Sequence, residues 1–174
     1  MKQELIDKYN VSVPRYTSYP PANFFRPFTG EEFLKEVDYS NEVCEKKLSF
    51  YFHMPFCRRL CHYCGCNSYP MAKEERVEAY VQALHKEIDL VAKHIDKSRR
   101  ISQIHYGGGS PTAMPVSVLK ELNEHLLSLF STIEQPEIAI ECHPGYLTAE
   151  DWQGLLDARF NRFSLGVQDF NEEV

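Results

Sequence analysis

The sequence lacks the long apolar runs and the long basic runs that mark membrane proteins and nucleic-acid-binding proteins. No apolar run approaches the roughly 20 residues that span a bilayer. Residues 1–8 carry charges where a signal peptide needs an apolar region. The formal net charge is −6 and the positive charges are scattered, which argues against a nucleic-acid surface. These absences predict a cytoplasmic protein that has neither a membrane nor a nucleic acid as a partner.

Cysteine is sparse over most of the chain and concentrated in one stretch. Of the six cysteines, four (Cys57, Cys61, Cys64 and Cys66) fall within ten residues. The apolar run 48–52 before them predicts a buried strand, which places the cysteines on the loop that leaves it. In the cytoplasm, such a group indicates metal or redox chemistry rather than disulfides. Three thiolates can hold three corners of an iron–sulfur cluster, and a structural zinc site that uses all four is the alternative.

Strands and helices are expected to alternate through the rest of the chain. Apolar spacing predicts strands at 48–52, 101–106, 137–142 and 163–169, and helices at 73–95, 115–130 and 148–156. Alternation of this kind calls for parallel strands, whose C-terminal ends gather ligand sites. Residues 1–47 are expected to form an N-terminal arm, with an extended segment at 14–21 and a helix capped by Thr29. For the helix at 148–156, Thr148 is the expected N-cap, with Asp151 at the capping-box position. Residues 48–174 are too few for a barrel of about 250 residues, so we expect the fold to break off partway.

Polar residues and glycines collect at the expected strand ends. The segment Gly107–Thr112 is either a plain turn or a place where backbone approaches a ligand closely. Glu141 and Gln168 stand in or at the end of apolar strands, where each either meets a ligand or makes a structural hydrogen bond. The remaining notable side chains are expected to be packed ones: the aromatics Tyr51 and Tyr63, the imidazoles His53 and His105, and the thiols Cys44 and Cys142.

The pattern CxxxCxYC after a strand resembles the radical S-adenosylmethionine superfamily. The strings PRYTSYP, HMPFCxxxCxYCGC, GGGSPT and GVQDF are similar to those of the oxygen-independent coproporphyrinogen III oxidases within it. The resemblance implies an α/β fold, namely a partial parallel (β/α) barrel truncated after about four strands, with an extended N-terminal arm. It also implies that residues 48–174 are the first part of this barrel.

The resemblance implies a cofactor site as well. Cys57, Cys61 and Cys64 would bind a [4Fe-4S] cluster whose open iron chelates S-adenosyl-L-methionine. Cys66 is a candidate active-site thiol that cluster ligation does not require. The residues implied to contact S-adenosyl-L-methionine are Tyr51, Tyr63, Gly108, Gly109, Ser110 and Glu141, with Gln168 contacting a second molecule of it. One departure is His143, where the family commonly has aspartate.

The implied reaction is the oxidative decarboxylation of coproporphyrinogen III to protoporphyrinogen IX without oxygen. Its partners would be coproporphyrinogen III and an unidentified one-electron donor, and the full-length protein would be a monomer. No catalytic residue is assigned, because the adenosyl radical abstracts the hydrogen. The alternatives are a haem chaperone, a haem methyltransferase, or a non-catalytic metal-binding fragment. We expect little or no turnover from the 174-residue chain alone.

Overall fold

The structure, a computed structural model, describes residues 3–10, 21–62, 64–167 and 169–171. The chain divides into two compact units, Met1–Phe33 and Leu34–Val174. The first holds helix α1 (Gln3–Tyr9), the short 3-10 helix η1 (Ala22–Phe24) and the beginning of helix α2 (Gly30–Val43). The placement of a domain boundary after residue 47 stays a prediction.

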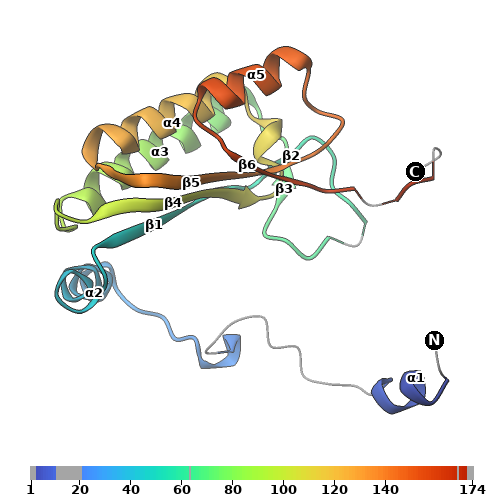
Figure 1. The fold of residues 1–174 in the computed structure, drawn as a ribbon, viewed down its shortest axis with the longest axis horizontal. Helices are drawn as coiled ribbons and strands as arrows, with labels where there is room; N and C mark the ends of the chain where they lie inside the picture. The colour runs from blue at the N-terminus through green and yellow to red at the C-terminus, as the bar shows by residue number, and fades with distance from the viewer. Residues whose placement is uncertain (1–2, 11–20, 63, 168, 172–174) are drawn as a thin grey trace. The chain divides into compact units, whose positions relative to one another are not determined.

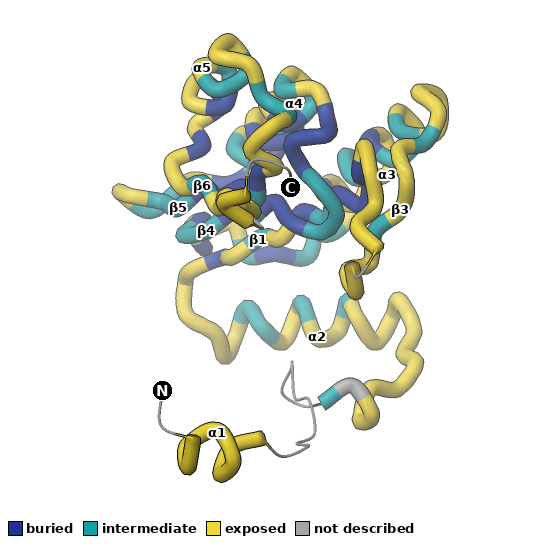
Figure 2. Tube along the Cα trace, turned by 90° about the vertical axis from the view of Figure 1, so that its right-hand side faces the viewer, coloured by how far each residue is buried: buried dark blue, intermediate teal, exposed yellow. Residues whose placement is uncertain are grey.

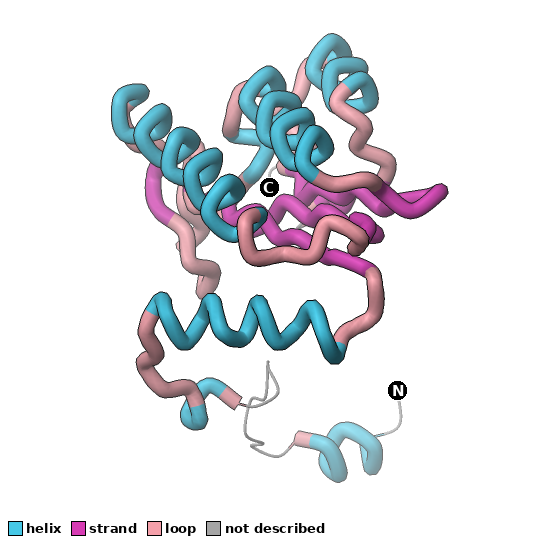
Figure 3. The backbone as a smooth tube through the Cα atoms, turned by 90° about the vertical axis from the view of Figure 1, so that its left-hand side faces the viewer, coloured by secondary structure: helices cyan, strands magenta, loops and turns pink. Residues whose placement is uncertain are grey.

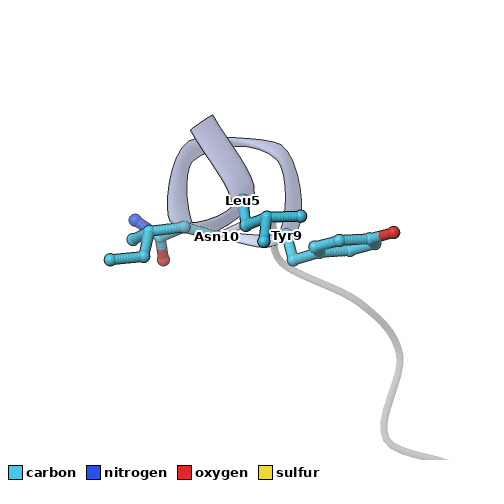
Figure 4. Close-up of a pocket in the computed structure, with 4 residues that line it drawn as sticks. Leu5, Tyr9 and Asn10 are labelled. Atoms are coloured by element: carbon cyan, nitrogen blue, oxygen red, sulfur yellow. The ribbon is translucent and has the colours of Figure 1, made fainter. Parts of the chain in front are cut away.

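The described part of the first unit is mostly exposed. Leu5, Ile6, Tyr9 and Asn10 line a hollow on α1 (Figure 4). The expected cap of α2 is confirmed, because the Thr29 backbone N–H donates to Glu32 Oε2 at 2.7 Å and the Glu32 N–H donates to Thr29 Oγ1 at 3.2 Å. The expected extended segment at 14–21 lies outside the described residues, apart from its last residue.

The second unit is built on a parallel four-stranded sheet, which confirms the predicted α/β class. Its strands are β1 (Lys47–Met54), β4 (Arg100–Gly108), β5 (Thr132–Cys142) and β6 (Arg162–Leu165), in the order β1-β4-β5-β6. The connections run through α3 (Glu74–Ala92), α4 (Val116–Leu129) and α5 (Ala149–Asp157). These three helices cover the same face of the sheet (Figures 1 and 3). All four strands therefore end at one edge, where a ligand site is expected.

The core lies between the sheet and this helix layer, as the buried segments in Figure 2 show. Residues 104, 106 and 140 of the strands and Leu119, Leu122 and Leu126 of α4 are fully buried. The buried side-chain amide of Asn123 lies among them and is satisfied: it accepts a hydrogen bond from the Tyr106 hydroxyl and donates one to the Ala158 carbonyl, each at 2.9 Å. The pattern of period two in the strands leaves the other face of the sheet polar.

That second face presents residues from three strands. Tyr51 of β1 is 59% exposed, and it pairs in register with His105 of β4. Side chains two residues apart along a strand point to the same face of the sheet. His53 and Glu141 each lie two residues along their strand from a member of the row that contains Tyr51 and His105, so they share this face. We call this surface the open face of the sheet.

Several local features differ from the sequence-based expectation. Strand β5 begins at Thr132 and not at 137. Strand β6 ends at Leu165 and not near 169. The Gly166 N–H still donates to the Cys142 carbonyl of β5 at 3.2 Å, but the next N–H, that of Val167, turns back to the Leu165 carbonyl at 3.1 Å. The short strands β2 (Phe56–Cys57) and β3 (Tyr69–Pro70) pair in parallel around the cysteines, and a 3-10 helix, η2 (Pro111–Ala113), follows β4. By contrast, the expected Thr148–Asp151 cap of α5 is present. Among the described residues, the helices are too short or too polar to cross a bilayer.

Candidate functional site

The segments that follow the four parallel strands meet at the C-terminal edge of the sheet. These are the cysteine loop after β1, the glycine turn after β4, residues 143–148 after β5 and residues 166–167 after β6. We define the cysteine loop as residues 57–68 and the glycine turn as residues 107–110. The cysteine loop and the glycine turn both lie where the sequence predicted, since polar residues and glycines were expected to cluster at the strand ends.

The cysteine loop is closed by backbone hydrogen bonds between the segments at its two ends. The Tyr69 N–H donates to the Pro55 carbonyl at 2.7 Å, and the Met71 N–H donates to the Cys57 carbonyl at 2.8 Å. Cys57 is buried at the base of the loop, whereas Cys61, Cys64 and Cys66 are exposed. The first thiol is thus held by the fold, and the others lie on the part of the loop that extends into solvent.

The glycine turn packs directly against the base of the cysteine loop. The Gly109 N–H donates to the Met54 carbonyl at 2.8 Å, and the Ser110 N–H donates to the Phe56 carbonyl at 3.1 Å. A Cβ at Gly109 would lie 2.9 Å from Cys57 Sγ and 2.9 Å from the Pro55 carbonyl oxygen, closer than such atoms approach. The position therefore accepts only glycine without a shift of the loop.

Gly108 is required for a different reason. Its φ of 114° lies in a region that side-chain-bearing residues rarely adopt. A Cβ there would also lie 2.7 Å from the ring of His53. The GGGS segment is therefore more than a plain turn, since its backbone is pressed against β1 and the first cysteine.

The thiols of the loop lie within electrostatic range of one another. Burial raises the pKa of Cys57, while hydrogen bonds from Ser110 and Ser68 act to lower it. Hydrogen bonds from the Cys66 backbone and from Ser68 lower the pKa of Cys64, whose Sγ lies 3.9 Å from the Ser68 hydroxyl. The neighbouring Cys64 in turn raises the pKa of Cys66. Thiolates are the form that binds metal, so Ser68 favours the binding form of two cysteines.

His53 joins the open face to the end of the cysteine loop. Its Nε2 lies 2.8 Å from the Asn67 carbonyl oxygen and its Nδ1 lies 3.0 Å from the Tyr51 hydroxyl. A carbonyl only accepts, so Nε2 carries the hydrogen and the Tyr51 hydroxyl donates to Nδ1. The sequence-based expectation that His53 only packs was therefore incomplete, because its ring connects two polar partners.

Tyr51 and Glu141 converge on the open face beside Cys66. Burial raises the pKa of Tyr51, and the charges of Glu141 and Cys66 raise it further. Glu141 Oε1 lies 3.3 Å from His105 Nε2, and the His105 ring stacks on Tyr51 with centroids 5.9 Å apart. The Glu141 side chain is 47% exposed, so the free-energy cost of removing its carboxylate from water is smaller than its position in an apolar strand suggested.

Several residues of this edge were not singled out from the sequence. Thr112 Oγ1 accepts a hydrogen bond from the His143 N–H at 3.0 Å, which ties the end of β4 to the end of β5. Arg58 of the cysteine loop lies over the Tyr146 ring at 4.7 Å, and His143 stacks on the same ring with centroids 3.8 Å apart. Thr112 belongs to the glycine-turn motif, and His143 had been noted as a departure from the family. Arg58 and Tyr146 had no signal, because contacts between distant loops leave none in a single sequence.

The expected site residues are thus brought to one edge of the sheet where the structure describes them. The exceptions are Tyr63 and Gln168, which lie outside the described residues. The expectation that Cys44 is buried was wrong, because it follows the end of α2 and is exposed; Cys142 is buried as expected. Among the described side chains, no three histidines, cysteines or acids converge as ligands of one metal ion. A donor set of three neighbouring thiols on one loop, with the first beside a close-packed glycine, nevertheless fits an iron–sulfur cluster.

Comparisons with known proteins agree with this geometry. The family model described as the radical SAM superfamily matches residues 51–174. Curated relatives named oxygen-independent coproporphyrinogen III oxidase are 38% identical over 172 residues in Synechocystis sp. and 41% identical over 171 residues in Escherichia coli. The alignments cover 98% of this chain and 37% and 36% of those proteins, so the chain spans little more than a third of their length.

A solved structure supports the fold as well as the family. The Escherichia coli coproporphyrinogen III oxidase, described as a radical SAM enzyme, superposes with a TM-score of 0.82 at 35% sequence identity. The superposition covers 98% of this chain and 37% of that one. The partial-barrel type expected from the sequence is therefore confirmed for the matched region. With its cysteine loop, glycine turn and parallel sheet in this arrangement, the chain belongs to the radical SAM superfamily.

Proposed function

We propose that Cys57, Cys61 and Cys64 bind a [4Fe-4S] cluster and leave its fourth iron open for S-adenosyl-L-methionine. Membership of the superfamily supports both groups in general terms. The observation that carries the residue-level proposal is the packing of the glycine turn on the first cysteine, with Gly109 too close to Cys57 Sγ for any side chain. This contact fixes one thiol of the donor set at the C-terminal edge of the sheet.

The residues around the cluster would then hold S-adenosyl-L-methionine. Gly108 and Gly109 expose backbone to a ligand, and the Ser110 hydroxyl already lies beside Cys57. Glu141 and Tyr51 supply a carboxylate and a hydroxyl on the open face. We extend the proposal to Tyr63 and Gln168 on the strength of their motif positions alone. Cys66, beside Cys64 and Glu141, is proposed as a thiol near the site and not as a ligand.

We further propose that the protein takes part in the oxygen-independent oxidation of coproporphyrinogen III to protoporphyrinogen IX. The relatives carry this name and match the chain over nearly all of its length. The chemistry that the cofactors supply when bound is one-electron cleavage of S-adenosyl-L-methionine to an adenosyl radical, which takes hydrogen from a propionate side chain. Each of two propionates would become a vinyl group by losing that hydrogen atom, carbon dioxide and one electron, which passes to an electron acceptor.

In this scheme the chain's own side chains hold one another in place around the ligand. The Tyr51 hydroxyl donates to His53 Nδ1, and His53 Nε2–H donates to the Asn67 carbonyl, so each group has a fixed orientation on the open face. The Glu141 carboxylate, held by His105, is placed to accept hydrogen bonds from a cationic ligand. The Arg58–Tyr146–His143 stack joins the cysteine loop to the segment after β5.

A chimera tests the function. The matching segment of the Escherichia coli relative is replaced by this chain, and the purified protein is given S-adenosyl-L-methionine, a reductant and coproporphyrinogen III without oxygen. We expect protoporphyrinogen IX from the chimera, none from its Cys57→Ala variant, and retained activity in a Cys44→Ala control, because Cys44 is outside the loop. A chimera that cleaves S-adenosyl-L-methionine but leaves coproporphyrinogen III unchanged would reject the substrate and keep the radical chemistry. A chimera that does neither would reject both.

A further inference from the structure

A second group of metal-ligating side chains lies in the helix layer, on elements that the proposed cofactor site does not use. His85 and Asp89 belong to α3, and His125 belongs to α4. The two helices lie side by side on the same face of the sheet (Figures 1 and 3). His85 and Asp89 are four residues apart, so they share one face of α3.

The two imidazoles meet nitrogen to nitrogen. His85 Nδ1 lies 2.7 Å from His125 Nδ1, while the ring centroids are 4.9 Å apart with an interplanar angle of 29°. Because the two nitrogens are much closer than the ring centres, their in-plane lone-pair directions point toward one another. On its other side, His125 Nε2 lies 2.9 Å from Asp89 Oδ1.

These contacts define the protonation of His125. A carboxylate only accepts hydrogen bonds, so Asp89 fixes the hydrogen of neutral His125 on Nε2. Nδ1 of His125 then has a free lone pair, directed at His85. A carboxylate that accepts from the far nitrogen of an imidazole is the usual outer partner of a metal-bound histidine, where it orients the ring and makes it more basic.

The site is also open enough for an ion to enter. The His125 side chain is 22% exposed and that of Asp89 is 55% exposed. Metal–nitrogen bonds of about 2.0–2.1 Å place two nitrogens of one ion roughly 3 Å apart. Both histidine side chains are partly exposed, so rotation about their torsions can widen the 2.7 Å separation and turn both lone pairs onto one ion.

We propose that His85 Nδ1 and His125 Nδ1 bind a divalent transition-metal ion between α3 and α4, with Asp89 holding the His125 ring. Imidazole ligands select zinc, nickel or copper over magnesium or calcium. Binding moves the hydrogen of neutral His85 from Nδ1 to Nε2, which leaves the Nδ1 lone pair for the ion, and water completes the coordination shell. The ion links two neighbouring helices of the outer layer. With only two direct protein ligands, the site is consistent with the lack of any three-ligand group among the described side chains.

The test is an NMR titration of the intact chain, labelled with ¹⁵N in its histidine rings, with Zn²⁺ as the probe. The readout is specific to each residue, so zinc taken up by the cysteine loop does not interfere and the outcome is independent of the cluster. We expect the Nδ1 resonances of His85 and His125 to shift together. Asp89→Asn weakens this binding about 10- to 100-fold, because the outer partner is lost.

His94 is the matched control in the same chain. Its Nδ1 lies 3.2 Å from Asp38 Oδ1, but no second imidazole faces it in the described structure. His94→Gln therefore leaves the titration at His85 and His125 unchanged. The proposal is overturned if both resonances keep their positions in a large excess of Zn²⁺. It is equally overturned if His125 binds Zn²⁺ as tightly in a His85→Gln variant as in the parent.

Discussion

Replacing Gly109 with alanine probes the contact on which the proposed cluster site depends. The added Cβ would lie 2.9 Å from Cys57 Sγ and 2.9 Å from the Pro55 carbonyl oxygen. One of these atoms belongs to backbone, so the loop itself must shift, and overpacking of this kind costs about 1–3 kcal/mol. The loss of chain entropy in the unfolded state returns about 0.4–1 kcal/mol. We expect a net destabilisation of about 1–2 kcal/mol, together with a displaced Cys57.

Gly65→Ala is the matched control, because Gly65 lies within the same cysteine loop and a Cβ there has nothing within 4 Å. Urea unfolding measures the free energy of unfolding of parent, Gly109→Ala and Gly65→Ala. Iron and acid-labile sulfide after anaerobic reconstitution measure cluster loading. Gly109→Ala is expected to lower both quantities, and Gly65→Ala neither. Parent-like stability and parent-like loading in Gly109→Ala would refute the reasoning that the glycine turn holds the first cysteine in place.

Three further predictions follow from the rest of the structure. Asn123→Leu leaves the buried Tyr106 hydroxyl and a backbone carbonyl without partners, so urea unfolding should show a loss of about 2–4 kcal/mol; a change below about 1 kcal/mol would contradict this. Lys46 holds the pKa of Asp96 well below its usual range, so the stability from this pair is present above about pH 4 and is lost as the pH falls toward the lowered pKa. In Asp96→Asn that part of the pH dependence of unfolding should disappear, and an unchanged pH profile would exclude it. Burial raises the pKa of Cys142 to about 11, so mass spectrometry should find this thiol unmodified by iodoacetamide at pH 7 while exposed thiols of the cysteine loop react; equal modification would disprove its burial.

The alternation of strands and helices was predictable because each element carries its own periodicity. Helix α4 presents Leu119, Leu122 and Leu126 to the core at helical spacing, and all three are fully buried. The caps at Thr29 and Thr148 were predictable because a capping box is local, with both partners within three residues. The end of β6 was not predictable, because the chain leaves the sheet where the Val167 N–H turns back to the Leu165 carbonyl, and apolar spacing does not mark this turn.

The site was predictable to the level of its motifs and not of its contacts. The cysteine spacing and the glycine segment located the edge of the sheet, and the structure brings Cys57 and Gly109 together there. The cross-loop stack of Arg58 on Tyr146 and the hydrogen bond to Thr112 join segments far apart in the chain. Nothing local in the sequence specifies such pairs. Glu141 was expected to be a costly charge within an apolar strand. The structure shows that its side chain is partly exposed on the open face of the sheet, which the sequence pattern did not indicate.

The most direct test of the central claim is the metal content of the chain after anaerobic reconstitution with iron and sulfide. The account predicts about four irons and four acid-labile sulfides per chain. It also predicts their loss in the Cys57→Ala, Cys61→Ala, Cys64→Ala triple variant and their retention in Cys66→Ala. Stoichiometric zinc without sulfide, or full loading of the triple variant, would contradict the account and leave the cysteine loop as a structural metal site or none at all.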